Sequence, residues 1–125
     1  MVSIMATNRT EIVRNRWDEL GLPAYYAEVL NEHVPLAIGY WVNNLSNDGE
    51  QGMAITDLDD NKHRLMPSHI RIGIDTILGD QNFKIRDDLK DVIAESFGDR
   101  DCGCLGVDEV DCIVQAGLFG ELVYG

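Results

Sequence analysis

The spacing of apolar residues predicts helices over the first third of the chain. Over 8–20, apolar residues recur every third or fourth position, which indicates a helix that stops at Gly21. Pro23 suits the first turn of a second helix. Pro35 cannot donate a backbone hydrogen bond, so this helix should end or kink just before it. For 36–45, the pattern favours a continuing helix over a strand.

Polar and turn-forming residues indicate a small β region in the middle of the chain. Residues 43–52 are rich in Asn, Ser, Asp and Gly and are typical of a loop. Residues 52–58 and 62–66 are strand candidates, and the Asp-Asp-Asn sequence at 59–61 has the chemistry of a tight turn. These segments predict one β-hairpin.

Three further helices are predicted from apolar stripes, over 67–79, 87–98 and 107–119. Glycine ends the first two, and acids occupy the first turn of the last two, where the helix dipole favours negative charge. The pattern as a whole predicts an α+β fold: a mostly helical single globular domain over 1–125, with about five helices and one small β-hairpin.

The net charge then limits the classes of function that are expected. The chain has 22 Asp and Glu residues against 10 Lys and Arg, a formal net charge of -12. Phosphate backbones and anionic membranes both require clustered basic residues, so direct nucleic-acid binding and membrane docking are not expected. The hydrophobic share of 45% argues against general disorder. Two interpretations remain open: a surface that only aids solubility, or one that binds a basic protein.

The acids that could bind a partner gather in the last third of the chain. Several pairs have helical spacing, such as Asp87 with Asp91 and Asp108 with Asp111, and would form small acidic faces. Helix starts account for many of them. The candidate partner-binding residues are Asp87, Asp88, Asp91, Asp99, Asp101, Asp108, Glu109 and Asp111.

The sequence gives little support for a cofactor site or a metal site. Cys102 and Cys104 form a C-x-C pair, which is not the usual zinc knuckle, and Cys112 reads as a buried structural thiol. Runs that begin at Asp57 and Asp99 resemble calcium loops but fail at the sixth and twelfth positions, so both read as solvated turns. We therefore predict no cofactor and no metal site.

Catalytic and targeting motifs also give no positive signal. The three histidines, His33, His63 and His69, read as ordinary surface residues because no partner or pocket is evident for a general base. Nucleophile elbows, phosphate-binding glycine loops and H-E-x-x-H are lacking from the sequence. An odd number of cysteines without a signal-peptide pattern predicts a reducing cytoplasm. We expect a non-enzymatic protein without a membrane span.

The final segment is apolar to its last positions, whereas chain ends normally fray. We expect it to be tucked into the core or into a partner subunit. A homo-oligomer interface would then use Phe119, Leu122 and Tyr124. Three segments together resemble small bacteriophage and prophage proteins of uncharacterised role: the Ile-Gly-Tyr-Trp sequence at 38–41, residues 69–78, and the Val-Gln-Ala-Gly-Leu-Phe-Gly-Glu-Leu-Val-Tyr-Gly ending at 114–125. The resemblance implies a phage accessory protein.

Two functions follow as expectations. The first is an acidic, non-enzymatic binding protein in the bacterial host cytoplasm, which inhibits a host defence or nucleic-acid-handling protein. The acidic surface would speed its encounter with such a basic target. The second is a phage structural or assembly protein, held as a homo-oligomer through its apolar C-terminal segment.

Overall fold

The computed structural model describes residues 22–47 and 52–125, and the helix predicted over 8–20 lies outside this part of the chain. The described chain begins with one continuous helical segment: α2 (Leu22–Glu28), a π-helical turn (Val29–His33) and α3 (Val34–Ala37). Pro35 lacks the N–H that a regular helix needs at that position, and the wider π turn before it is the local adjustment. The irregularity predicted near Pro35 is therefore confirmed.

A three-stranded antiparallel sheet follows, in the order β1-β2-β3, formed by β1 (Val42–Asn47), β2 (Met53–Asp57) and β3 (Lys62–Leu65). The predicted hairpin is confirmed as β2 and β3. The predictions of a helix over 36–45 and a loop over 43–52 are wrong where they cover β1. Leu45 lies opposite Ile55 in the β1–β2 register, and only Val42 and Leu45 of β1 are half-buried. Pairing with β2, rather than an alternating pattern of its own, makes this segment a strand.

The other three helices lie where the apolar stripes predict them: α4 (Pro67–Gly79), α5 (Asp87–Asp99) and α6 (Val107–Phe119). A short 3-10 turn (Cys102–Cys104) connects α5 to α6. The end of α5 differs in detail from the prediction. Gly98 was expected to stop the helix, but Arg100 is the residue in the left-handed conformation, with φ of 56°. The α+β architecture is thus observed, with four helical segments in the described ranges.

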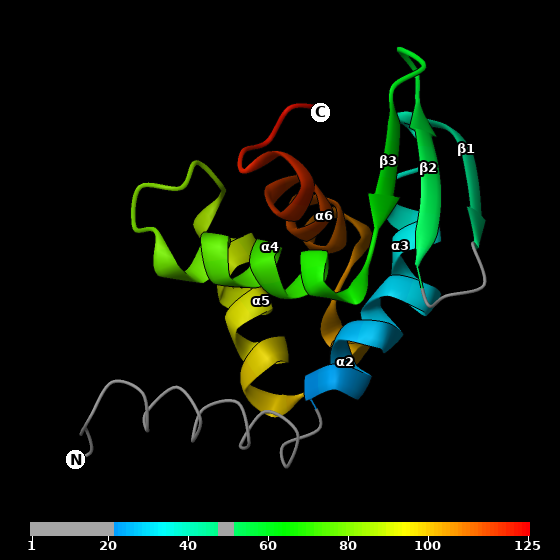
Figure 1. The fold of residues 1–125 in the computed structure, drawn as a ribbon. Helices are drawn as coiled ribbons and strands as arrows, with labels where there is room; N and C mark the ends of the chain where they lie inside the picture. The colour runs from blue at the N-terminus through cyan, green and yellow to red at the C-terminus, as the bar shows by residue number, and fades with distance from the viewer. Residues whose placement is uncertain (1–21, 48–51) are drawn as a thin grey trace, which may run out of the picture.

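The closest helix contact is the crossing of α4 and α6, which Figure 1 shows at the centre of the molecule. Two glycines form it. A Cβ atom added to Gly73 would lie 2.0 Å from the Ile113 carbonyl oxygen, and one added to Gly117 would lie 2.1 Å from that of His69. The two backbones therefore touch directly, which places the buried face of α6 deep in the core.

The helices cover one face of the sheet, and the core lies between the two layers (Figure 1). Met53, Ile55 and Leu65 point inward from the strands, and Trp41 joins them just before β1. The chain beyond α6 turns back over this helix towards the hairpin. Within the described ranges, helices are too short or too polar to cross a bilayer.

Candidate functional site

The structure separates the eight predicted partner-binding acids into groups with different roles. Six are exposed: Asp87, Asp88, Asp91, Asp99, Asp101 and Asp108. Four of these lie along α5, whose ends are about 18 Å apart at 1.5 Å per residue. The first three are at its start and Asp99 is at its end. Because α5 separates them, the exposed acids form two clusters and not one continuous face.

Glu109 differs from the exposed acids because it caps its own helix. Its side chain is buried, and Oε1 accepts a hydrogen bond of 2.5 Å from the Gly106 N–H at the start of α6. This is one half of a capping box, in which an acid three residues into the helix reaches back to the N-cap. The structure therefore gives Glu109 a capping role that its sequence position in the first turn of α6 indicates, and its part in a binding surface stays a prediction.

Asp111 is half-buried and holds two segments together. Its Oδ2 accepts a hydrogen bond of 2.5 Å from the Tyr40 hydroxyl, and its Oδ1 accepts one of 2.8 Å from the Trp41 indole N–H. Gln115, one turn further along α6, donates to the same Oδ1 at 3.0 Å. Burial and the adjacent Asp111 carboxylate raise the pKa of Tyr40, so its hydroxyl remains a protonated donor. Asp111 thus fixes the α3–β1 connection onto α6.

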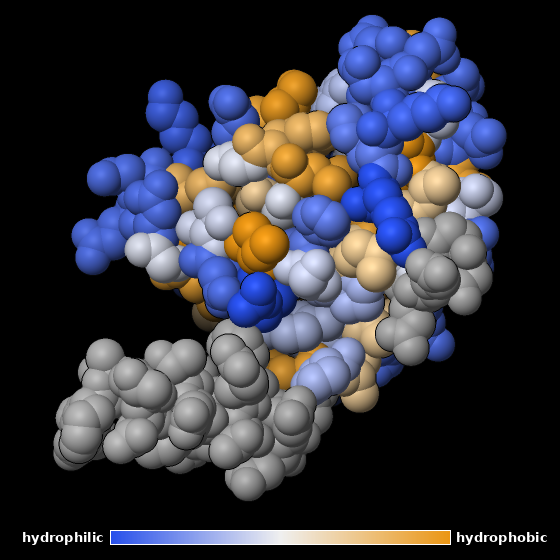
Figure 2. Space-filling model, viewed as in Figure 1, coloured by the Kyte–Doolittle hydropathy of each residue, from blue (hydrophilic) through white to orange (hydrophobic). Residues whose placement is uncertain are grey.

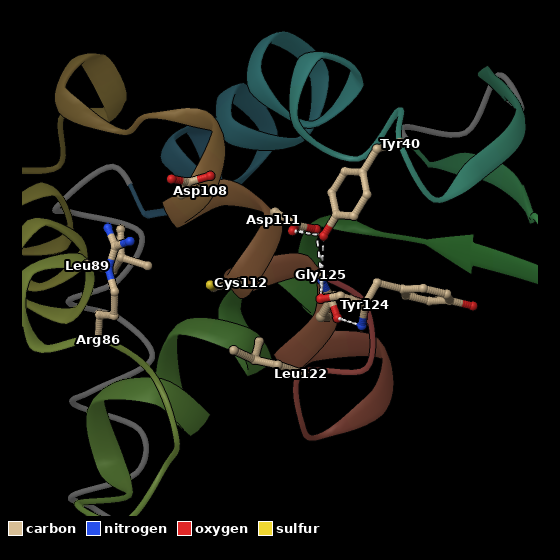
Figure 3. Close-up of a pocket in the computed structure, with 10 residues that line it drawn as sticks. Tyr40, Arg86, Leu89, Asp108, Asp111, Cys112, Leu122, Tyr124 and Gly125 are labelled. Atoms are coloured by element: carbon tan, nitrogen blue, oxygen red, sulfur yellow. Dashed lines mark hydrogen bonds between the residues drawn. The ribbon is translucent and has the colours of Figure 1, made fainter.

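A pocket of about 250 Å³ lies beside Asp111, between the start of α5, the first turns of α6 and the chain end (Figure 3). Arg86 and Asp108 line the same side of it, and the pKa of Arg86 is raised by Asp88 and, to a smaller degree, by Asp108. The Arg86 guanidinium is paired with Asp88 through two hydrogen bonds of 3.1 Å each. Apolar lining comes from Leu89, Cys112 and Leu122. The lining of the pocket therefore combines carboxylates and a guanidinium with hydrocarbon.

The cysteine environments do not favour thiol chemistry. Burial, together with the neighbouring Asp111, raises the pKa of the Cys112 thiol to about 11. Burial and a hydrogen bond with Glu28 raise that of Cys102 to about 12. The thiolate is the reactive form, so both thiols are inert near neutral pH. Cys104 is exposed. In the described ranges, groups of three or more His, Cys, Asp or Glu residues placed to share a metal ion were not found.

Gln115 is the polar centre of the C-terminal contacts, although the sequence marks it only as an isolated polar residue. Its side chain is 1% exposed. The Oε1 atom accepts hydrogen bonds from the backbone N–H groups of Val123 and Tyr124, both at 2.7 Å. Its Nε2 donates to the Tyr124 carbonyl oxygen at 3.2 Å. One amide side chain therefore pairs with the backbone of the chain end as a neighbouring strand would.

The Tyr124 side chain lies in an aromatic site. Its ring stacks on Trp41, with centroids 4.8 Å apart and planes 4° from parallel. It also meets Phe119 edge to face at 6.1 Å. The Tyr124 hydroxyl donates to Asp57 Oδ2 at 3.3 Å, which ties the chain end to the hairpin.

Asp57 is buried, whereas the sequence read it as the start of a solvated turn. Its Oδ1 accepts from the N–H groups of Asp59 and Asn61 in the turn, at 2.9 and 3.0 Å. Its Oδ2 lies 3.0 Å from His63 Nε2, and because a carboxylate only accepts, this nitrogen carries the proton. The hydrogen bond from His63, more than the turn amides, lowers the pKa of Asp57 to about 2.

Two of the histidines are therefore not ordinary surface residues. His63 pairs with Asp57, and its ring meets Phe119 edge to face at 5.3 Å. His69 Nδ1 accepts a hydrogen bond of 2.9 Å from the Met66 N–H and caps α4. Burial lowers the pKa of His69, which favours the neutral ring that this bond requires. Both roles are structural. The His69 cap has the local three-residue spacing of a capping box, whereas the pairing of His63 with Asp57 depends on the hairpin.

The three residues predicted to form an oligomer interface, Phe119, Leu122 and Tyr124, are half-buried against the core of their own chain. The chain end is therefore tucked in, as one of the two sequence interpretations expected. Figure 2 shows hydrophobic surface over the end of α6 and the chain end, whereas the hairpin tip is hydrophilic. Val123 in this region is 55% exposed. Whether the region is an oligomer interface stays a prediction.

Comparisons with protein-family models, with curated proteins and with solved structures found no match. The resemblance to small phage proteins thus stays a prediction. Functional inference rests on the fold, the acids and the C-terminal contacts.

Proposed function

We propose that this chain is a non-enzymatic binding protein that engages a basic surface on another protein through the start of α5 and the start of α6. Its partner-binding edge consists of Asp87, Asp91 and Asp108. The observation that carries the proposal is that these three acids are exposed and that, among the described residues, their side chains make no hydrogen bond or ion pair like the one between Asp88 and Arg86. Exposed carboxylates on a chain of net charge -12 attract a basic partner and speed its association.

The pocket beside this edge suits a lysine or arginine side chain from the partner. Such side chains place their hydrocarbon stem on apolar surface and keep the charged head near oxygen acceptors. Leu89 and Leu122 offer the apolar wall, and Asp108 offers an exposed carboxylate. Arg86 does not oppose this arrangement with its full charge because Asp88 pairs with it.

The proposed biological form is a phage accessory protein that inhibits a host defence or nucleic-acid-handling protein in the bacterial cytoplasm. Proteins that handle nucleic acids present basic grooves, and a carboxylate-rich edge competes there with phosphate groups. The resemblance of the 38–41 and 114–125 segments to phage proteins supports the same setting. A second candidate is a structural or assembly protein that self-associates through its C-terminal residues. The hydrophobic surface over that end supports it (Figure 2).

The test is capture of partners from a bacterial lysate on the tagged chain, at low and high salt, followed by affinity measurement with the purified partner. The site variant is Asp87→Asn/Asp91→Asn/Asp108→Asn. Its matched control, with the same charge change, replaces exposed acids elsewhere: Glu32→Gln/Asp60→Asn/Glu121→Gln.

We expect a partner with a nucleic-acid-binding surface that is released by high salt and competed by DNA. The site variant should bind it about tenfold more weakly, since three exposed charge pairs at about 0.5 kcal/mol each sum to about 1.5 kcal/mol. The control should bind nearly as well as the wild type. Equal weakening by the two variants would show that only net charge matters, and salt-insensitive binding would refute the proposal.

A further inference from the structure

Another pocket, of about 130 Å³, lies between the helical segment that contains α3 and the start of α6. We call it the anchor pocket, and its lining residues are His33, Leu36, Leu105, Gly106, Val107 and Val110. Leu105 and Val110 are buried, whereas Leu36 and Val107 are 76% and 55% exposed. Large aliphatic side chains that stay in water around a pocket are typical of a surface that binds another molecule.

The fold holds both walls of the anchor pocket in place without a ligand. On one wall, Val34 and Ala37 are buried in the core, and Leu36 between them is left facing water. On the other wall, the Gly106 N–H donates to Glu109 Oε1 at 2.5 Å and fixes the first turn of α6. A preformed pocket loses little conformational entropy when it is filled, so more of the interaction energy is available for binding.

The size and lining of the anchor pocket suit one apolar side chain. Apolar cavities of about 150 Å³ in proteins hold a molecule of the size of benzene, so this pocket accommodates a side chain such as that of leucine. Four of its six lining residues are leucine or valine. A leucine that enters the pocket therefore removes apolar surface of both molecules from water.

The anchor pocket adjoins the partner-binding edge along the first turns of α6. Val107 and Val110 are three residues apart and share one side of the helix, whereas Asp108 and Asp111 share the next side and line the 250 Å³ pocket. A helix is only about 10 Å across with its side chains, so one segment of a partner can cover both pockets.

We propose that the anchor pocket takes a leucine-like side chain from an amphipathic helix of the basic partner, with Lys or Arg three or four residues away on the same face. Side chains at that spacing are neighbours on a helix, as the anchor pocket and the acidic edge are neighbours on α6. Charge indicates a basic occupant, because the exposed acids Glu32 and Asp108 are each next to a lining residue on a chain of net charge -12. This inference rests on the proposed binding function and names the residue pattern by which the same partner is recognised.

Two fluorescein-labelled peptides of Ala and Lys serve as probes, each about 16 residues long so that an Ala-rich helix can form. The leucine probe has one Leu with Lys residues three and four positions away, and the alanine probe has Ala in place of that Leu. Fluorescence anisotropy measures their binding to the full chain at low salt. We expect the leucine probe to bind about tenfold more tightly, because burial of one leucine contributes that much. Equal binding of the two probes overturns the inference.

A charge-neutral variant locates the preference for leucine. Leu36→Asn/Val107→Asn changes two exposed side chains, so the fold should be kept, and it should bind both probes as weakly as the wild type binds the alanine probe. The matched control, Leu58→Asn/Ile72→Asn, changes exposed apolar residues outside the pocket and should keep the tenfold preference. A preference that survives in Leu36→Asn/Val107→Asn overturns the inference.

The variant Asp87→Asn/Asp91→Asn/Asp108→Asn separates this inference from the proposed function. It should weaken both probes by the same factor and leave the preference for leucine unchanged. If it weakens both probes but the wild type shows no preference, the anchor pocket is refuted and the acidic function stands. If it weakens neither probe, the acidic function is refuted, and the basic character of the occupant with it. Sedimentation velocity tests the other occupant: a wild-type dimer that Leu36→Asn/Val107→Asn abolishes would place a second copy on the pocket and overturn the inference.

Discussion

The contact between α4 and α6 predicts that alanine at Gly73 is strongly destabilising. The Cβ atom would lie 2.0 Å from the Ile113 carbonyl oxygen and 3.1 Å from the Gly117 backbone nitrogen. Carbon and oxygen atoms in close contact stay about 3.3 Å apart, so the helices must separate by roughly 1.3 Å. Both obstacles are backbone atoms, so rotation of a side chain cannot relieve the clash.

This separation loosens the packing of α6, whose Ile113, Val114 and Ala116 side chains are buried. Overpacking of a dense core typically costs 1–3 kcal/mol, and a backbone clash belongs at the upper end, so we expect a loss of about 3 kcal/mol. With a urea m-value of about 2 kcal/mol/M, the unfolding midpoint should fall by about 1.5 M. Circular dichroism at a series of urea concentrations measures this.

Gly98→Ala is the matched control, because it makes the same substitution in helix α5. A Cβ atom at Gly98 meets nothing within 4 Å. Alanine should therefore stabilise the chain, by about 0.5–1 kcal/mol, through its higher helix propensity. If Gly73→Ala changes the free energy of unfolding by less than about 1 kcal/mol, or if the two variants behave alike, the close-contact reasoning is wrong.

Three further predictions concern the polar groups. The pKa of Asp57 is lowered to about 2, so its contribution to stability is complete above the ordinary value of 3.8 and is lost as the pH falls through 2. Asp57→Asn should therefore flatten the dependence of the melting temperature on pH between 4 and 2, and an unchanged slope would contradict the assignment. Gln115→Leu removes three hydrogen bonds to the backbone of Val123 and Tyr124. Hydrogen exchange of these two backbone amides, measured by NMR, should therefore speed up at least tenfold, with the hairpin amides as the internal reference. A thiol reagent at neutral pH should modify Cys104 quickly and the buried Cys102 and Cys112 only on unfolding. Fast modification of Cys102 or Cys112 in the folded chain would contradict their burial.

Apolar periodicity predicts a helix best where the apolar stripe in its sequence is also the face that the fold buries. α6 is predicted over 107–119 and observed there because its buried stripe and acidic first turn agree. β1 shows the opposite case. Its sequence has three Asn residues and no alternation, so local preference does not indicate a strand. The strand forms because β2 offers hydrogen-bonding groups along one edge. This pairing depends on the tertiary fold, so the local sequence pattern does not predict it.

Sequence reasoning about the candidate site succeeds for exposed acids and fails for polar residues that the fold buries. Asp87 and Asp91 are exposed at helical spacing as predicted. Asp57 was missed because its contact with Tyr124 comes from 67 residues away, and Gln115 was missed because its partners lie beyond the end of its own helix. A turn aspartate and a helical glutamine are common on protein surfaces, so neither has a local signal that separates the buried role from the exposed one.

The single carboxylate of Asp57 links two distant parts of the chain. One oxygen organises the hairpin turn through Asp59 and Asn61, and the other receives the Tyr124 hydroxyl. The turn and the chain end therefore depend on the same carboxylate, and any coupling between them is reciprocal by thermodynamic linkage. A molecule that bound the hairpin tip and distorted its turn would alter how firmly the chain end stays seated. Equally, an event that drew out the chain end would reach the hairpin tip without touching it.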